Sequence, residues 1–175
     1  MFIPNLDQSY FELFAFEESF FVDNLRLDSR FRELQNEFHP DRFAGGTDRQ
    51  KRASLQFSSF LNEAYQALKH PLPRALYLLQ LKGIDVENYA RHNTDPSFLM
   101  QQIEMREKLE GIGSDEDQLA LFLTQVMDQY DATVSSVAAC FDLNDWAKAA
   151  VETVKLQFLD KLRLEAEELE SELDY

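Results

Sequence analysis

Glycine and proline are scarce in this chain of 175 residues, and they fall where helical patterns of apolar residues break. The ten positions are Gly45, Gly46, Gly83, Gly111 and Gly113, with Pro4, Pro40, Pro71, Pro73 and Pro96. Because these two residues disfavour a helix interior more than any others, long stretches without them favour helices. Alternation of apolar and polar side chains, which would predict strands, is rare. The sequence therefore predicts an all-α protein.

The first half of the chain contains one short and two long helical patterns. Residues 10–14 are apolar-rich, and Asp23 is a plausible N-cap for a helix that runs to about Phe38. The next long helix is expected at residues 49–69. Spacings of three and four give each long helix an apolar stripe. The first stripe is Leu27, Phe31, Leu34 and Phe38, and the second is Ala53, Phe57, Phe60, Ala64 and Leu68. Two such stripes predict an antiparallel hairpin.

Prolines follow the second long helix and are expected to end it at Pro71 and Pro73. A shorter apolar helix is then expected at residues 74–82, with Gly83 as its stop. Residues 84–93 are polar and are expected to form a connector without a helix.

The second half predicts three further helices joined by short loops. Asp95 followed by Pro96 is an N-cap with proline at the first helical position, so the first helix starts near residue 96. Gly111 and Gly113 are expected to end it. Ser114 is expected to cap the second helix, and the third begins near residue 144 or 145. Short loops between three helices predict an antiparallel three-helix bundle.

Charge is divided unevenly along the chain, whose net charge is −15. Residues 1–75 hold nine basic and eleven acidic side chains, whereas residues 76–175 hold eight basic and twenty-one acidic ones. A surface so negative repels a phosphate backbone and an anionic membrane, so we expect neither nucleic acid nor membrane as a partner. The contrast between the halves suggests two modules with different partners.

The loop between the two long N-terminal helices displays an imidazole and a carboxylate. Its sequence is Phe38-His39-Pro40-Asp41-Arg42-Phe43. A residue before proline avoids the α region, so His39 should leave the helix, and Pro40 stiffens the loop. Asp41 could then accept two hydrogen bonds from an arginine of a partner. The alternative interpretation is a plain helix-ending turn, in which proline and aspartate are common.

His39-Pro40-Asp41 between two antiparallel helices resembles the signature of J-domains, the modules that stimulate ATP hydrolysis by DnaK-type chaperones. The resemblance extends to residues 10–14, to Asn62-Glu63-Ala64-Tyr65-Gln66-Ala67-Leu68 and to His70-Pro71-Leu72-Pro73-Arg74-Ala75. With the C-terminal segments, the chain resembles the HscB family of J-domain co-chaperones of iron–sulfur cluster assembly. The sequence shows no cysteine-rich zinc module before the J-domain, which points to the bacterial type.

This resemblance implies a domain organisation and a chaperone-binding site. Residues 1–75 would be the J-domain, residues 76–93 a connecting helix and linker, and residues 94–175 a three-helix scaffold-binding domain. A DnaK-type chaperone ATPase (HscA-like) would bind Arg32 and the loop residues, which are His39, Pro40 and Asp41. Acidic and amide residues interrupt the basic residues before the loop, so a dedicated chaperone is the more plausible partner.

The helix after Pro96 carries a second apolar face. At 100° per residue, Phe98, Met105, Leu109 and Ile112 form one stripe that can join a bundle core. Leu99, Met100 and Ile103 point well away from it and are interleaved with Glu104, Glu107 and Glu110. They could pack under the linker or the preceding helix, which is the commoner fate of apolar residues. They could also form a protein-binding face.

The resemblance favours the second interpretation, because this stretch binds the cluster scaffold protein (IscU-like) in the HscB family. The residues that match its contact positions are Leu99, Met100, Ile103, Glu104, Glu107 and Phe158. Gly111 stands where the family can have a further acidic contact.

Other signals predict neither a cofactor nor catalysis. The three histidines are isolated, no phosphate-binding glycine loop or nucleophile motif occurs, and we expect no metal site, no cofactor and no enzyme. The single Cys140 fits a packed thiol in a reducing compartment. Residues 1–5 lack the basic and apolar regions of a signal peptide, so the cytoplasm is expected. A J-domain protein with a different client, an acidic adaptor without a chaperone and a small-molecule enzyme stay open as alternatives.

Overall fold

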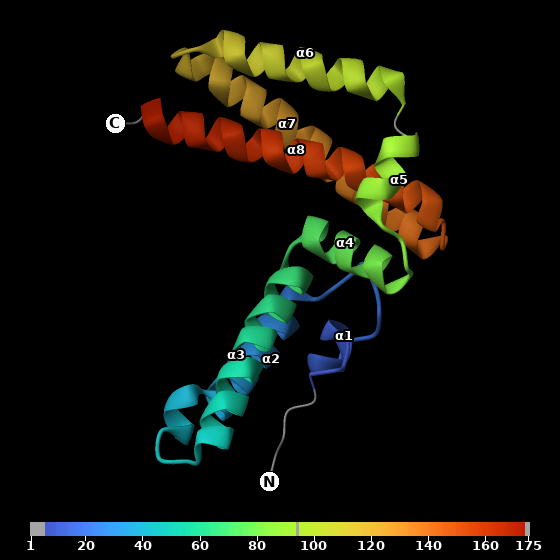
Figure 1. The fold of residues 1–175 in the computed structure, drawn as a ribbon. Coiled ribbons are helices and arrows are strands. Elements are labelled where there is room, and N and C mark those ends of the chain that lie inside the picture. The colour runs from blue at the N-terminus through green and yellow to red at the C-terminus, as the bar shows by residue number, and fades with distance from the viewer. Residues whose placement is uncertain (1–5, 94, 174–175) are drawn as a thin grey trace. The chain divides into compact units, whose positions relative to one another are not determined.

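In the computed structural model, residues 6–93 and 95–173 are described, and every regular element within them is a helix. Residues 1–5, on which the signal-peptide expectation rests, lie outside that part. The chain divides into two compact units, residues 1–78 and residues 79–175. Figure 1 shows the order of the helices along the chain. The all-α prediction is confirmed.

The N-terminal unit is built on two long antiparallel helices, α2 (Asn24–Phe38) and α3 (Asp48–Lys69), which lie side by side in Figure 1. The short helix α1 (Tyr10–Leu13) packs against α3. Asp23 caps α2 as predicted, because its carboxylate accepts hydrogen bonds from the first free N–H groups of that helix. Thr47 caps α3 in the same way.

Aromatic and leucine side chains fill the core of this unit. The most deeply buried are Phe11, Phe14, Leu27, Phe57, Leu61 and Leu68. Both predicted stripes contribute, but α3 also buries Leu61 and Ser54, which lie beside its predicted stripe. The ring of Phe38, at the end of α2, meets that of Phe57 edge to face at 4.6 Å. The two long helices are therefore joined close to the loop that connects them.

A buried guanidinium closes the other end of this helix pair. Arg74 is 6% exposed, and its side chain donates hydrogen bonds to the carbonyls of Leu68, Lys69 and Phe20. Satisfying the last carbonyls of α3 with a cation suits the negative end of the helix dipole. Arg74 thereby ties the start of the next helix to the end of α3 and to the segment before α2.

Two expectations on the central segment are wrong. Helix α4 (Pro71–Leu81) begins at Pro71 instead of residue 74, because proline is well tolerated in a first helical turn, where an N–H has no partner. Residues 84–93 are not a helix-free connector, since α5 (Val86–Asn93) occupies most of them and packs against the last helix. Gly83 does follow the end of α4, with a φ of 75°.

The C-terminal unit is the predicted three-helix bundle, with α5 added. Its helices are α6 (Pro96–Ile112), α7 (Glu116–Asp142) and α8 (Trp146–Leu173). Three residues of the predicted α6 stripe, Met105, Leu109 and Ile112, are buried in the bundle core. The fourth, Phe98, is partly buried and packs against that core. The core consists of Met105, Leu109, Ile112, Leu119, Phe122, Val126, Phe158, Leu159, Leu162 and Ala166.

The caps of these helices follow the sequence with two corrections. Asp95 caps α6 as predicted, whereas Asp115 caps α7 in place of Ser114. Gly111 lies inside α6, and only Gly113 follows its end, with a φ of 60°. Within the described ranges, no helix is long and apolar enough to span a bilayer. The same ranges contain no cluster of three or more histidine, cysteine or acidic residues suited to a metal ion.

Candidate functional site

The loop that joins α2 to α3 is held outside the helices by its own sequence. His39 leaves α2 with φ and ψ of −57° and 132°, the extended conformation that a following proline demands. Pro40 then begins a single 3-10 turn, η1 (Pro40–Phe43). The N–H of Arg42 donates to the His39 carbonyl at 3.0 Å, and that of Ala44 donates to the Asp41 carbonyl at 3.2 Å. The prediction that His39 leaves the helix is confirmed.

The two chemically active side chains of this loop are exposed and close together. The side chain of His39 is 49% exposed and that of Asp41 is 90% exposed. The backbone N–H of Asp41 donates to Nδ1 of His39 at 3.3 Å, so the neutral ring carries its proton on Nε2. The loop therefore offers an imidazole N–H donor and a carboxylate acceptor side by side.

The three arginines of α2 have different roles. Arg26 is bound to its own unit, since it donates to the Ala15 carbonyl and stacks over Phe16. Arg30 pairs with Glu33 on the same helix. Arg32 is exposed on α2, in the turns before the loop.

Further positive charge stands on the other side of the loop, on residues for which the sequence suggested no role. Arg49, Lys51 and Arg52 are exposed on the first turns of α3, and Arg42 is exposed in the loop itself. The run Arg49-Gln50-Lys51-Arg52 was a visible signal for this. The exposed cations around the loop therefore come mainly from η1 and α3, with Arg32 on α2.

Helix α6 exposes apolar side chains on the face opposite its core stripe. Leu99, Met100 and Ile103 are 48%, 58% and 51% exposed, and the interleaved Glu104 and Glu107 are exposed too. These five residues make up the α6 patch. The alternative interpretation, that the three apolar residues pack under the linker or the preceding helix, does not hold.

Phe158 does not belong to this patch. It is 9% exposed, and its ring meets that of Phe98 edge to face at 5.9 Å. Together with Met105 it lines a shallow cleft among the three long helices of the bundle. Phe158 thus supports α6 from beneath, while the α6 patch lies on the surface.

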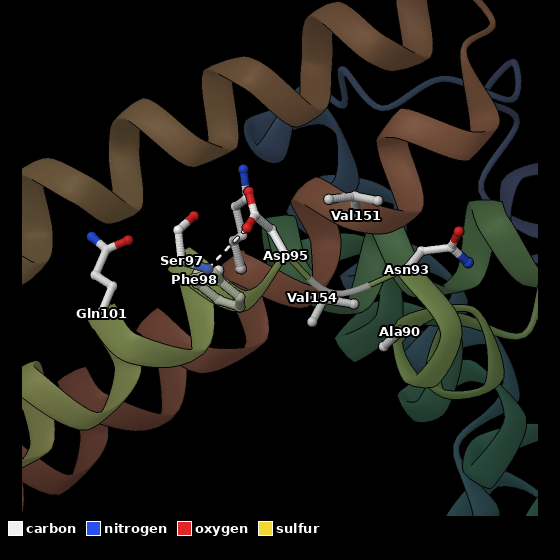
Figure 2. A pocket seen from close by; sticks show the side chains of 9 residues that line it. Ala90, Asn93, Asp95, Ser97, Phe98, Gln101, Val151 and Val154 are labelled. Carbon is white, nitrogen blue, oxygen red and sulfur yellow. Dashed lines mark hydrogen bonds between the residues drawn. The ribbon is translucent and has the colours of Figure 1, made fainter.

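A pocket of 240 Å³ lies near the start of α6, and Figure 2 shows Gln101 and Asn93 at its opposite ends, with Asp95 and Ser97 between them. Its two charged groups, Asp95 and Lys155, already have partners. Asp95 accepts the Ser97 N–H at 2.9 Å, and this bond lowers the pKa of the Asp95 carboxyl. Lys155 pairs with Glu152 at 2.8 Å. The pocket is smaller than a usual small-molecule site and offers no convergent polar groups for a substrate.

Comparisons with known proteins agree with this arrangement of helices. Residues 94–167 match the family described as the HSCB C-terminal oligomerisation domain. Among solved structures, the chaperone HscB from Vibrio cholerae is 38% identical, with a TM-score of 0.85 over 95% of this chain and 99% of that one.

Two eukaryotic structures extend the likeness. The human co-chaperone protein HscB is 29% identical, with a TM-score of 0.88 over 94% of this chain and 83% of its own. The Jac1 co-chaperone from Saccharomyces cerevisiae is 26% identical, with a TM-score of 0.76 over 92% of this chain and 93% of its own. The likeness thus covers both units of the chain.

Proposed function

Because this chain belongs to the HscB family of co-chaperones, we propose that it links two partners in iron–sulfur cluster assembly. It stimulates the ATPase of a DnaK-type, HscA-like chaperone and delivers an IscU-like scaffold protein to it. ATP and the cluster belong to those partners, and this chain itself is no enzyme. The observation that carries the proposal is the exposed imidazole and carboxylate of His39 and Asp41, held at the bend of a paired helical hairpin.

The loop acts on the chaperone by preferential binding. The Asp41 carboxylate can accept a bidentate pair from an arginine of the chaperone, and Nε2 of His39 can donate to a neighbouring acceptor. Exposed cations such as Arg32 and Arg52 attract an acidic surface beside that contact. A loop that binds the hydrolysis-competent state more tightly than the other raises the population of that state.

The α6 patch binds the scaffold. Its three apolar side chains supply area to bury, and its carboxylates favour a partner face that carries lysine or arginine. With both partners on one chain, each is present at a high effective concentration for the other.

The cytoplasm is the compartment we propose. Cys140 is a buried free thiol, and burial raises its pKa, so it is unreactive and needs no oxidising environment.

His39→Gln tests the chaperone contact. The amide keeps polarity, but it cannot reproduce the ring geometry, so we expect stimulation of chaperone ATPase to be abolished. Steady-state ATP hydrolysis is measured with chaperone alone, with this protein, with the scaffold and with both. His92→Gln, the same change at an exposed site on α5, is the control and should leave stimulation intact. Full stimulation by a folded His39→Gln variant would disprove the proposed contact.

Replacing Leu99, Met100 and Ile103 together by alanine tests the α6 patch. Because the variant loses the apolar contacts of three half-exposed side chains, we expect scaffold affinity to fall at least about 30-fold. This corresponds to a loss of roughly 2 kcal/mol of binding free energy. Calorimetry measures the affinity. The matched control is the triple alanine variant of Leu121, Met127 and Leu164, which are exposed elsewhere on α7 and α8. Equal affinities for the two variants would rule out the patch and leave a different client as the alternative.

A further inference from the structure

The end of α2 replaces backbone hydrogen bonds with side-chain ones. Pro40 has no N–H, so it cannot donate to the Asn36 carbonyl four residues earlier. The guanidinium of Arg42 donates to that carbonyl instead, at 3.1 Å. In a continued helix the N–H of Arg42 would reach the carbonyl of Phe38, but here it goes to His39. The last turn before the loop therefore depends on donors from outside its own backbone.

Ser54, on α3, supplies one of these donors. Its hydroxyl donates to the Phe38 carbonyl at 2.9 Å across sixteen residues of sequence, and the side chain is buried, with 4% exposed. A helical serine or threonine ordinarily donates to the carbonyl four residues back in its own helix. Several hydroxyls in this protein do so: Thr124, Thr133, Ser135 and Thr153. Ser54 instead crosses to the residue that directly precedes His39.

We propose that Ser54 is a positioning residue for the loop, whose hydroxyl fixes the end of α2 and thereby sets where His39 and Asp41 stand. This inference rests on the proposed function, because it concerns the same loop and the same chaperone. It adds a residue that touches neither partner and that no pattern in the sequence singles out.

The physical consequence is a change in population. The Phe38–Phe57 ring contact holds the side chain of Phe38, while the Ser54 bond holds its carbonyl. Without that bond the peptide between Phe38 and His39 can rotate, so the loop spends less time in the binding-competent arrangement. The apparent affinity for the chaperone then falls in proportion to the population of that binding-competent arrangement, whereas the structure of the docked complex is unchanged.

The test uses the full chain with Ser54→Ala, and Ser59→Ala as the matched control. Ser59 is exposed on the same helix, so the control makes the same chemical change away from the loop. ATPase stimulation of a DnaK-type chaperone is titrated with each variant to separate the half-maximal concentration from the maximal rate. Heteronuclear NMR relaxation of the Asp41 and Arg42 amides reports loop mobility directly, and a thermal melt reports the fold.

We expect Ser54→Ala to raise the half-maximal concentration roughly 2- to 10-fold at an unchanged maximal rate, since one net hydrogen bond is lost. We also expect the two loop amides to become more mobile. A half-maximal concentration and amide mobilities equal to those of the Ser59→Ala control would overturn the proposal. A lower melting temperature with no change in those two quantities would overturn it as well. A Ser54→Ala chain without a cooperative melt would overturn it too, because the hydroxyl would then hold the whole unit.

Failure of the proposed function gives a different result. If the unmodified chain stimulates no DnaK-type chaperone, the chaperone contact is disproved. The amide mobilities of the two variants then decide by themselves whether Ser54 orders the loop.

Discussion

At the scale of single residues, one carboxylate joins the two long helices of the N-terminal unit. Asp28, on α2, accepts hydrogen bonds from Nζ of Lys69 at 2.5 Å and from the Tyr65 hydroxyl at 3.0 Å, both on α3. The Tyr65 ring also stacks on Phe31 with centroids 4.2 Å apart. The hydrogen bond from Lys69 holds the pKa of the Asp28 carboxyl below its usual value. Folding therefore favours the ionised form of Asp28.

This contact predicts a pH-dependent stability. Since the folded pKa lies below the unfolded one, near 3.9, the contribution of Asp28 is complete above about pH 4 and is lost as pH falls through the folded value. We expect Asp28→Asn to lower the free energy of unfolding by about 1 kcal/mol at pH 7. The difference from the unmodified chain should shrink below pH 4. Denaturant titrations measure it, with Glu37→Gln, an exposed change on α2, as control. A difference that is constant with pH would contradict this account.

At the scale of elements, two glycines two residues apart have opposite roles at the end of α6. Gly111 lies within the helix, and a β-carbon added there would have no atom within 4 Å outside its own stretch of helix. Gly113 also has open space, but its φ of 60° with a ψ of −120° is strained for any residue with a β-carbon. Space alone therefore does not decide which substitution is tolerated.

These two positions predict opposite changes in stability. We expect Gly111→Ala to stabilise the protein by up to about 1 kcal/mol, because alanine loses less conformational entropy in a helix. Gly113→Ala should destabilise it by about 1–2 kcal/mol. Unfolding midpoints in denaturant give both values, and each variant serves as the other's control. A change in unfolding free energy of the same sign for both variants would mean that α6 does not end at Ile112.

At the scale of the whole molecule, the chain has two units with different cores and different charge. The core of the C-terminal unit comes from α6, α7 and α8, with Phe122 only 1% exposed. In the N-terminal unit, Phe57 on α3 is 2% exposed. The strongly acidic half of the sequence folds into the C-terminal unit, which carries the α6 patch.

Alanine substitutions of these two phenylalanines test whether the cores act separately. Each removal of a buried ring is expected to cost about 3–5 kcal/mol. Phe57→Ala should reduce the hydrogen-exchange protection of amides in α2 and α3, and Phe122→Ala that of amides in α7 and α8. Loss of protection throughout the chain from either variant would show that the two units unfold together.

Local chemistry made several features predictable from the sequence. The Asp23 cap, the extended His39 and the start of α6 at Asp95 and Pro96 depend on neighbouring residues alone. Helical periodicity likewise placed Met105 and Leu109 in the core of the bundle and Leu99 and Met100 outside it. Such features are decided within a few residues, where the chain's own geometry is sufficient.

Features that depend on a distant neighbour appeared only in the folded chain. Helix α5 has a mostly polar sequence, and its packing against α8 gives it a partner that no local pattern records. Phe158 matched a contact position but lies under Phe98. Ser54 looks like any polar helical residue until α2 brings the Phe38 carbonyl to it. The sequence by itself determined most of the helices, the caps at Asp23 and Asp95, and the separation of Leu99 and Met100 from the core stripe of α6. Long-range packing decided that α5 forms and which buried side chains support the loop and the α6 patch.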